Sequence, residues 1–232
     1  MPQAPVLPPA AGRTYVDTTM AQSPYLVGQL LLSMPGIGDP RFERKVIAMC
    51  LHDAEGALGL VVNSRLDDGG EALTVRALME QLDIDPGITP AEARVMAGGP
   101  VEPGRGFILH SAAYEGQRTI MVGRAQAEGR YNSGWGLTST LDVLKDIAAG
   151  KGPRQWLAAL GYTGWSAGQL DAEMTRHGWH VAPGDSAILF ETAVGQRWPA
   201  AFAGIGIDGG LLSATPGRAG PAGQPGACAV RP

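Results

Sequence analysis

Short apolar runs separated by tight turns dominate the pattern along this chain. Residues 25–34 form a nearly continuous apolar run that ends at Pro35 and Gly36, which predicts a buried first strand. Two further runs, residues 45–52 and 57–63, flank a short connection that contains Gly56, and this spacing predicts a β-hairpin. The same reasoning predicts shorter strands at residues 94–97, 105–111, 119–122, 155–162 and 187–191; residues 155–162 also fit a helix, and the strand is favoured.

Four helices are predicted, one from apolar residues on one face behind a capping residue, two from capping-box pairs, and a last one that tolerates Pro199 in its first turn. The first helix covers residues 74–82, with Thr74 as its cap. The second begins with the Ser139–Asp142 pair and ends at Gly150, and the third runs from the Ser166–Gln169 pair to about His177. The fourth covers residues 196–205 and has Pro199 in its first turn. Strands and helices mix without a regular βαβ alternation. The pattern therefore indicates an α+β or mixed-sheet fold.

The composition agrees with a folded core and frequent turns. Apolar residues make up 44% of the 232 residues, which excludes wholesale disorder, and 34 Gly with 18 Pro argue against a helical bundle. The Pro-rich residues 1–22 and the Gly/Ala/Pro-rich residues 220–232 are predicted to be disordered. One domain over residues 23–219 remains.

The net charge and the absence of long apolar segments argue against nucleic acid and membranes as partners. The net charge of −4 opposes a duplex-binding surface, so direct nucleic-acid binding is not expected. No apolar run approaches a membrane span, and the first residues lack a secretory signal. With two cysteines, a disulfide framework is not expected either, and a cytoplasmic location is the simplest interpretation.

Cys50 and His52 are the first candidates for chemistry. Residues two apart on a regular strand share a face, so the imidazole of His52 would favour the reactive thiolate of Cys50. The alternative is that Cys50 is a buried core residue, because free cysteine is among the most buried residue types. An apolar setting would raise the thiol pKa.

The Gly98-Gly99-Pro100 corner and Arg105 form a second candidate. Consecutive glycines can turn backbone N–H groups toward an anion, and Arg105 would add a bidentate donor, with His110 on the same strand. The alternative, which the pattern favours, is a sharp corner between two strands that needs positive φ. Phosphate-loop and dinucleotide fingerprints are absent.

Two weaker motifs are set aside. Residues 164–168 match G-x-S-x-G, but no His follows Asp185 to complete a hydrolase triad, and Ser166 has a competing role as a helix cap. His177 and His180 lack a third metal ligand, so no metal site is predicted.

Several long motifs together resemble the YqgE/AlgH family. They are GQLLLSMPGIGDPRFERKVIAMCLHDAEGALGLVVN (28–63), GGPVEPGRGFILH (98–110), LTSTLDVLKDIAAGKGP (137–153), LGYTGWSAGQLDAEMTRHGW (160–179), Arg197-Trp198 and Gly206-Ile207-Asp208. The resemblance covers about residues 23–219 in the right order. The positions that match the family pattern are Pro35, Asp39, Cys50, His52, Gly56, Gly59, Asn63, Gly98, Gly99, Pro100, Arg105, Gly106, Phe107, His110, Gly161, Trp165, Gly168, Gln169 and Leu170. His177 stands where relatives usually carry Asn.

The resemblance implies a single compact α+β domain with a mixed, barrel-like sheet and helices packed outside. It implies no established enzyme activity and no cofactor, and the family's frequent label of transcriptional regulator does not require DNA contact. No helix-turn-helix with a basic recognition helix is visible.

These observations lead to one main hypothesis and one alternative. The main hypothesis is a non-enzymatic module that binds a small ligand or a protein partner in a hollow between two corners of the sheet. Its ligand-binding residues would be Cys50, His52, Asn63, Gly98, Gly99, Arg105 and His110. The alternative is a thiol-dependent redox or transfer activity, with Cys50 and His52 as the catalytic residues.

Overall fold

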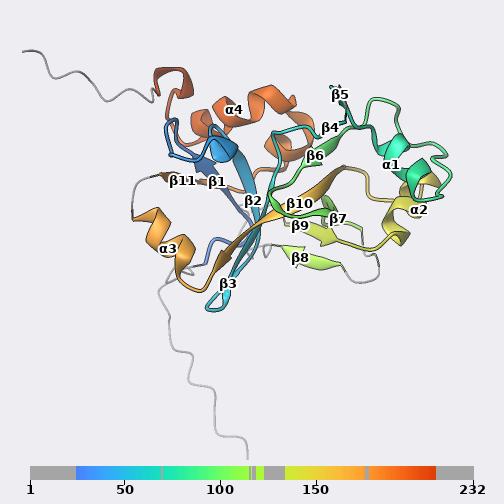
Figure 1. Cartoon of the computed structure of the whole chain (residues 1–232), viewed down its shortest axis with the longest axis horizontal. Helices are drawn as coiled ribbons and strands as arrows, with labels where there is room; N and C mark the ends of the chain where they lie inside the picture. The colour runs from blue at the N-terminus through green and yellow to red at the C-terminus, as the bar shows by residue number, and fades with distance from the viewer. Residues whose placement is uncertain are drawn as a thin grey trace, which may run out of the picture.

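The computed structural model describes residues 25–212, apart from residues 69, 115, 117–118, 123–133 and 176–177. In this part of the chain the fold is an α+β domain built on one curled, mostly antiparallel sheet (Figure 1). Its strands run in the order β11-β1-β2-β3-β10-β7-β9-β8, and β6 adds a parallel pair to β10. The mixed, barrel-like sheet expected for the family is therefore confirmed.

The strands are β1 (Gln29–Ser33), β2 (Val46–Asp53), β3 (Gly56–Val61), β6 (Val95–Ala97), β7 (Val101–Ser111), β8 (Ile120–Val122), β9 (Trp135–Thr138), β10 (Trp156–Ser166) and β11 (Trp179–Pro183), with a separate pair of β4 (Asp67–Asp68) and β5 (Glu71–Ala72). The helices are α1 (Val75–Gln81), α2 (Asp142–Ala148), α3 (Gln169–Met174) and α4 (Arg197–Gly204). Short helical turns are η1 (Pro40–Phe42), η2 (Ala187–Glu191), η3 (Val194–Gln196) and η4 (Gly209–Leu211).

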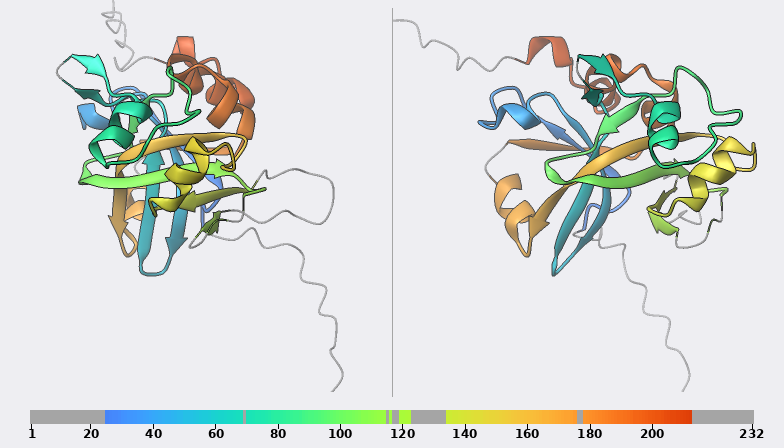
Figure 2. Two further views of the ribbon diagram at one scale, coloured as in Figure 1. Left: turned by 90° about the vertical axis from the view of Figure 1, so that its right-hand side faces the viewer. Right: turned by 45° about the vertical axis from the view of Figure 1, so that its right-hand side comes forward.

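Alternation along the strands gives the sheet two buried faces. Leu30, Val46 and Ala48 lie in one core cluster together with Trp198 and Phe202 of α4, so α4 packs on that face. The intervening residues belong to two clusters on the other face, one with α1 and α2 and one with α3. Figure 2 shows the same arrangement, with α3 and the α1–α2 pair at different ends of the sheet.

Most predicted elements are confirmed, with shifted ends. The β2–β3 hairpin forms where it was expected, and Asp53 Oδ1 accepts hydrogen bonds from the amides of Glu55 and Gly56 in its turn. Thr74 caps α1 through a hydrogen bond from the amide of Ala77. β7 and β10 are both longer than predicted.

Two predictions about elements are wrong, and two strands of the sheet were missed. Ala187–Glu191 is a helical turn instead of a strand. Asp185 stabilises the turn, because its Oδ1 accepts a hydrogen bond from the amide of Ala187 and its carbonyl accepts one from the amide of Leu189. α2 begins at Asp142 without a side-chain cap, so Ser139 does not cap it, although Gly150 ends it at φ +72° as expected. β9 and β11 were not predicted.

The predicted helix after Ser166 is shorter, and its cap differs. α3 runs from Gln169 to Met174, and Gly168 precedes it at φ +69°. The amide and hydroxyl of Ser166 both donate to Gln169 Oε1, so Ser166 is a donor and not the expected N-cap acceptor. His177, Cys228 and both predicted disordered ends lie outside the described residues. Within the described residues, no helix is long and apolar enough to cross a membrane.

Candidate functional site

Cys50 lies inside the core. Its side chain is 0% exposed among the apolar residues of β1, β2 and α4, and Sγ donates a hydrogen bond of 3.4 Å to the carbonyl of Ala48. Burial raises the pKa of Cys50 to about 12. The thiol is therefore protonated and shielded from solvent at neutral pH.

His52 does not share a face with Cys50, and that expectation is wrong. The β2–β3 register shifts between Met49 and Leu51, so Cys50 is the extra residue of a β-bulge. Past the bulge, His52 is paired with Ala57, whose side chain belongs to the core cluster of α3. The expected Cys50–His52 pair does not form.

The contacts of His52 define the state of its ring. Nδ1 accepts a hydrogen bond of 3.0 Å from the amide of Leu26, so in the neutral ring the proton is on Nε2. Nε2 lies 4.0 Å from Asp171 Oδ1 of α3, and the edge of the ring meets Tyr25. His52 thereby connects the end of β2 to the segment before β1 and to α3.

Asn63 has a structural role in this geometry. Its Oδ1 accepts from the amide of Val46 and its Nδ2 donates to the carbonyl of Arg44, both at 2.8 Å. Arg44 has φ +51°, so the Asn63 amide fixes a left-handed residue at the entrance to β2.

The Gly98-Gly99 corner packs directly on β10. The amide of Gly98 donates to the carbonyl of Leu160, and the carbonyl of Gly98 accepts from Val61 of β3. A Cβ on Gly98 would lie 2.3 Å from the carbonyl oxygen of Gly161. The corner needs glycine because two backbones approach each other closely, and the amide of Gly98 is not available to an anion.

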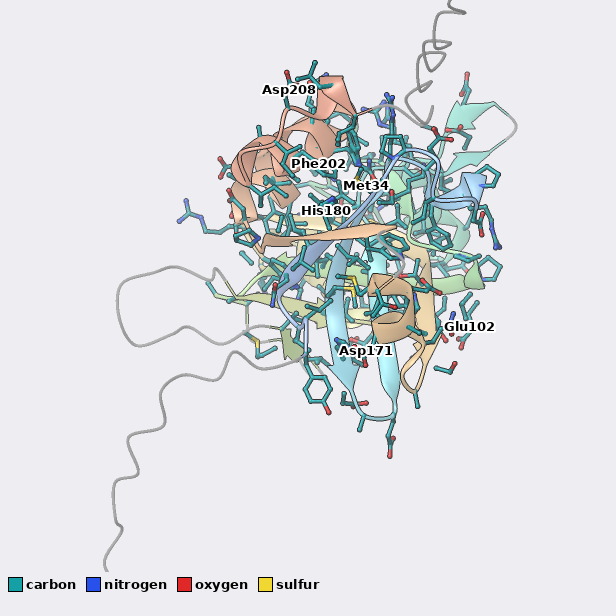
Figure 3. The ribbon with its side chains drawn as sticks, turned by 90° about the vertical axis from the view of Figure 1, so that its left-hand side faces the viewer. Met34, Glu102, Asp171, His180, Phe202 and Asp208 are labelled. Atoms are coloured by element: carbon teal, nitrogen blue, oxygen red, sulfur yellow. The ribbon has the colours of Figure 1, made fainter. Side chains whose placement is uncertain are left out.

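Arg105 and His110 point to different surroundings. Arg105 is half-exposed, lies 3.3 Å from Glu102, and stacks on Phe107 (Figure 3 labels Glu102 at the periphery). His110 is 0% exposed; its Nδ1 donates to the carbonyl of Ser111, so Nε2 accepts from Thr138. Burial lowers the pKa of His110 below its ordinary value of 6.5.

The seven predicted site residues therefore do not form one hollow. The structure brings the Gly98 corner beside β3, near Asn63, but Cys50, His52, Arg105 and His110 lie in four separate surroundings. His180 of β11 packs edge-on against Phe202 (Figure 3). No group of three metal-binding side chains occurs among the described residues.

A cavity of about 430 Å³ beside the start of α4 offers a better candidate site. Four arginines from separate segments line it: Arg65 after β3, Arg94 before β6, Arg154 before β10, and Arg197 at the first position of α4. Trp156 and Phe190 add aromatic surface to the same cavity. We call this the arginine cavity.

Arg197 is the buried one of the four arginines that line the arginine cavity. Its side chain is buried, the residue being 6% exposed, and it donates from Nε to the carbonyl of Thr192 at 3.1 Å and from Nη1 to the carbonyl of Val62. Burial, followed by repulsion from the charge of Arg65, lowers the pKa of Arg197 to about 10. Arg197 is therefore still charged at neutral pH.

No counter-ion balances these charges in the part of the chain that the structure describes. None of the four arginines has a carboxylate within the ion-pair distance of 4.0 Å there. Glu92 is the one acidic residue among those that line the cavity. Buried arginines are almost always paired, so an unpaired one beside a second cation is unusual.

Sequence reasoning missed this site, because the four arginines are far apart along the chain. The one signal was Arg197-Trp198, which appeared as the closing motif of the family resemblance. Anion binding was assigned to Arg105, whose charge the structure pairs with Glu102.

Comparisons with known proteins agree on one family. A family model described as AlgH-like matches residues 30–210. A "UPF0301 protein" from Rhizorhabdus wittichii is 53% identical over 194 residues, which is 84% of this chain and 97% of the relative. A second, from Novosphingobium aromaticivorans, is 46% identical over 200 residues, covering 86% of this chain and 100% of the relative.

Two solved structures are similar to the fold. The solution structure of the AlgH protein from Pseudomonas aeruginosa is 37% identical, with a TM-score of 0.65 over 86% of this chain and 100% of that protein. A crystal structure of a protein from Corynebacterium diphtheriae, 17% identical, has a TM-score of 0.55 over 78% of this chain and 87% of that one, a likeness of fold alone.

Proposed function

The chain belongs to the AlgH-like family, and we propose that this member is a ligand-binding module that holds a small anion in the arginine cavity. The observation that carries the proposal is Arg197, a buried cation for which the described residues supply no counter-ion, on the wall of a cavity with three further arginines. A bound anion would supply the missing negative charge.

The chemistry of the arginine cavity selects a class of ligand. A guanidinium binds phosphate or carboxylate through two parallel hydrogen bonds, and four of them suit a ligand with more than one negative charge. Trp156 and Phe190 offer flat apolar surface for an unsaturated or ring-shaped part of the ligand. A volume of about 430 Å³ is suited to a small organic molecule.

The geometry does not favour the thiol-dependent alternative. The Cys50 thiol is enclosed in the core with a raised pKa, and the imidazole of His52 lies on the other face of the sheet. A thiol that reacts needs both access and thiolate character. We therefore base the proposal on binding alone.

The test compares anions on variants that keep the buried Arg197. Pyrophosphate and citrate are titrated calorimetrically into wild type, Arg65→Gln and Arg154→Gln, whose exposed side chains have no hydrogen bond to lose in the described structure. Lys145→Gln, an exposed residue of α2 outside the cavity, is the matched loss of one positive charge. Pyrophosphate binding without citrate binding would identify a phosphate site, and the reverse result a carboxylate site.

We expect at least one of the two anions to bind wild type and K145Q equally. Binding to R65Q and R154Q should be about tenfold weaker or more, since a charge-assisted hydrogen bond contributes about 1.5–3 kcal/mol. Equal binding to all four proteins, or no binding to wild type, would refute the proposal. Arg105→Gln is titrated as a fifth protein, and a loss of binding confined to it would also refute the arginine cavity and point to the Gly98–Arg105 corner.

A further inference from the structure

A second cavity, of about 460 Å³, lies on the α3 side of the sheet and has the opposite chemistry. It is enclosed by η1, by Pro100 and Val101, by the far end of β10, by α3, and by the start of β11. None of the four arginines of the arginine cavity lines it. We call it the aromatic cavity.

Three aromatic rings from three elements line the aromatic cavity. Phe42 of η1 meets Trp179 of β11 edge-to-face at 5.9 Å between ring centroids, and Trp179 meets Trp165 of β10 in the same way at 6.2 Å. These edge-to-face contacts join the three rings into one set, and the guanidinium of Arg41 lies over the ring of Phe42, 5.8 Å from its centroid. Electron-rich ring faces attract cations.

Glu173 of α3 places a carboxylate among these rings. Its Oε2 accepts hydrogen bonds from the indole N–H groups of Trp165 at 3.0 Å and Trp179 at 3.1 Å, and its Oε1 accepts from Gln169 at 3.0 Å. All three donors are neutral. Among the described residues, which leave out residues 176–177, no Lys, Arg or His lies within ion-pair distance of Glu173.

The other charged residues of the aromatic cavity neutralise each other. Arg41 donates to both carboxylate oxygens of Asp39, with Nη2 at 2.7 Å from Oδ2 and Nε at 3.1 Å from Oδ1. The two side chains are on the rim, 66% and 36% exposed respectively. The Arg41 hydrogen bonds lower the pKa of Asp39. Glu173 is therefore the remaining charged side chain among the described residues that line the cavity.

We infer that the aromatic cavity binds the ammonium group of a small organic cation, a primary or quaternary amine. Aromatic rings and one carboxylate that no described cation pairs with are the two features that favour such a group over a neutral one of the same shape. This inference is independent of the arginine cavity. It adds a second ligand class that the proposed function does not require.

The experiment compares choline with its neutral carbon analogue, 3,3-dimethylbutan-1-ol, which has the same shape without the charge. Both are titrated into the wild-type chain, with tryptophan fluorescence and calorimetry as readouts. Glu173→Gln removes the charge and keeps an acceptor for the indoles. Glu55→Gln, an exposed carboxylate in the β2–β3 turn, is the matched control.

We expect choline to bind wild type and E55Q equally, about tenfold more weakly to E173Q, and more weakly to Phe42→Leu, which keeps apolar volume but loses the ring. The neutral analogue should bind wild type much more weakly than choline. No choline binding to wild type, equal binding of choline and its analogue, or unchanged binding to E173Q would overturn the inference. If circular dichroism shows that E173Q does not fold, the inference is tested by the difference between choline and its neutral analogue and by choline binding to Phe42→Leu.

Discussion

Cys50 and His52 are two residues apart in β2, yet their side chains lie on opposite faces of the sheet. The bulge at Cys50 separates them, and the thiol is left in an apolar core while the imidazole turns toward α3. This separation indicates that Cys50 is a core residue and not a catalytic thiol, and the reactivity of the thiol can be tested chemically.

Cys50 should resist alkylation as long as the chain is folded. At about pH 8 we expect iodoacetamide to leave Cys50 unmodified in native protein and to modify it fully in guanidinium, because the buried thiol has a pKa of about 12. Peptide mapping by mass spectrometry separates Cys50 from Cys228. Alkylation of native Cys50 at the rate of a free thiol would show that the thiol is accessible.

His110 should make the fold less stable in mild acid. Its pKa is lower in the folded state than the ordinary 6.5, so the unfolded chain takes up the proton first. The stability from neutral His110 is complete above about pH 6.5 and is lost as the pH falls below that value. Urea unfolding at about pH 7.5 and about pH 5.5 should show a smaller difference for His110→Gln than for wild type.

An NMR titration provides the independent measurement for the same residue. The ring protons of His110 should titrate below 6.5 in the folded protein, because burial disfavours the charged ring and so lowers its pKa. Titration at or above 6.5 would contradict the buried neutral ring.

Asn63→Ala should destabilise the fold by about 1–3 kcal/mol. The change removes two hydrogen bonds and leaves the amide of the buried Val46 without its acceptor. Asn63→Asp keeps the acceptor but not the donor to Arg44, so its loss should be smaller. Denaturant titrations measure both, and equal losses for the two variants would refute the assigned roles.

Gly98 and Gly104 should respond differently to a methyl group. Gly98→Ala places Cβ 2.3 Å from the carbonyl oxygen of Gly161, and we expect a loss of about 1–3 kcal/mol. Gly104→Ala meets nothing within 4 Å, so its effect should be within about 0.5 kcal/mol. A harmless Gly98→Ala would mean that the corner adjusts freely.

Apolar patterning predicts most of this fold because most strands alternate regularly between two buried faces. β1 and the part of β2 before the bulge follow that rule, and the Thr74 cap and the Gly150 helix end follow from local chemistry. Ala187–Glu191 could not be assigned correctly, since a short apolar run has no periodicity that separates strand from helix. The deciding residue there is Asp185, which lies before the run.

The candidate sites show why linear spacing finds so little of this chemistry. Arg65, Arg94, Arg154 and Arg197 meet only after four segments have folded, and no short motif contains any two of them. Of the residues named in advance, Asp39, Pro100, Trp165 and Gln169 line the aromatic cavity, but no argument from the sequence brought them together as one site. A bulge such as the one at Cys50 also has no reliable mark in the sequence.

β10 extends from the arginine cavity to the aromatic cavity, and its length bears on whether one molecule could occupy both. Trp156 lines the arginine cavity near one end of the strand, and Trp165 lines the aromatic cavity near the other. Nine steps of about 3.3 Å separate them by roughly 30 Å along the strand. The two cavities therefore lie toward opposite ends of β10, and full occupancy would place two separate molecules on one polypeptide.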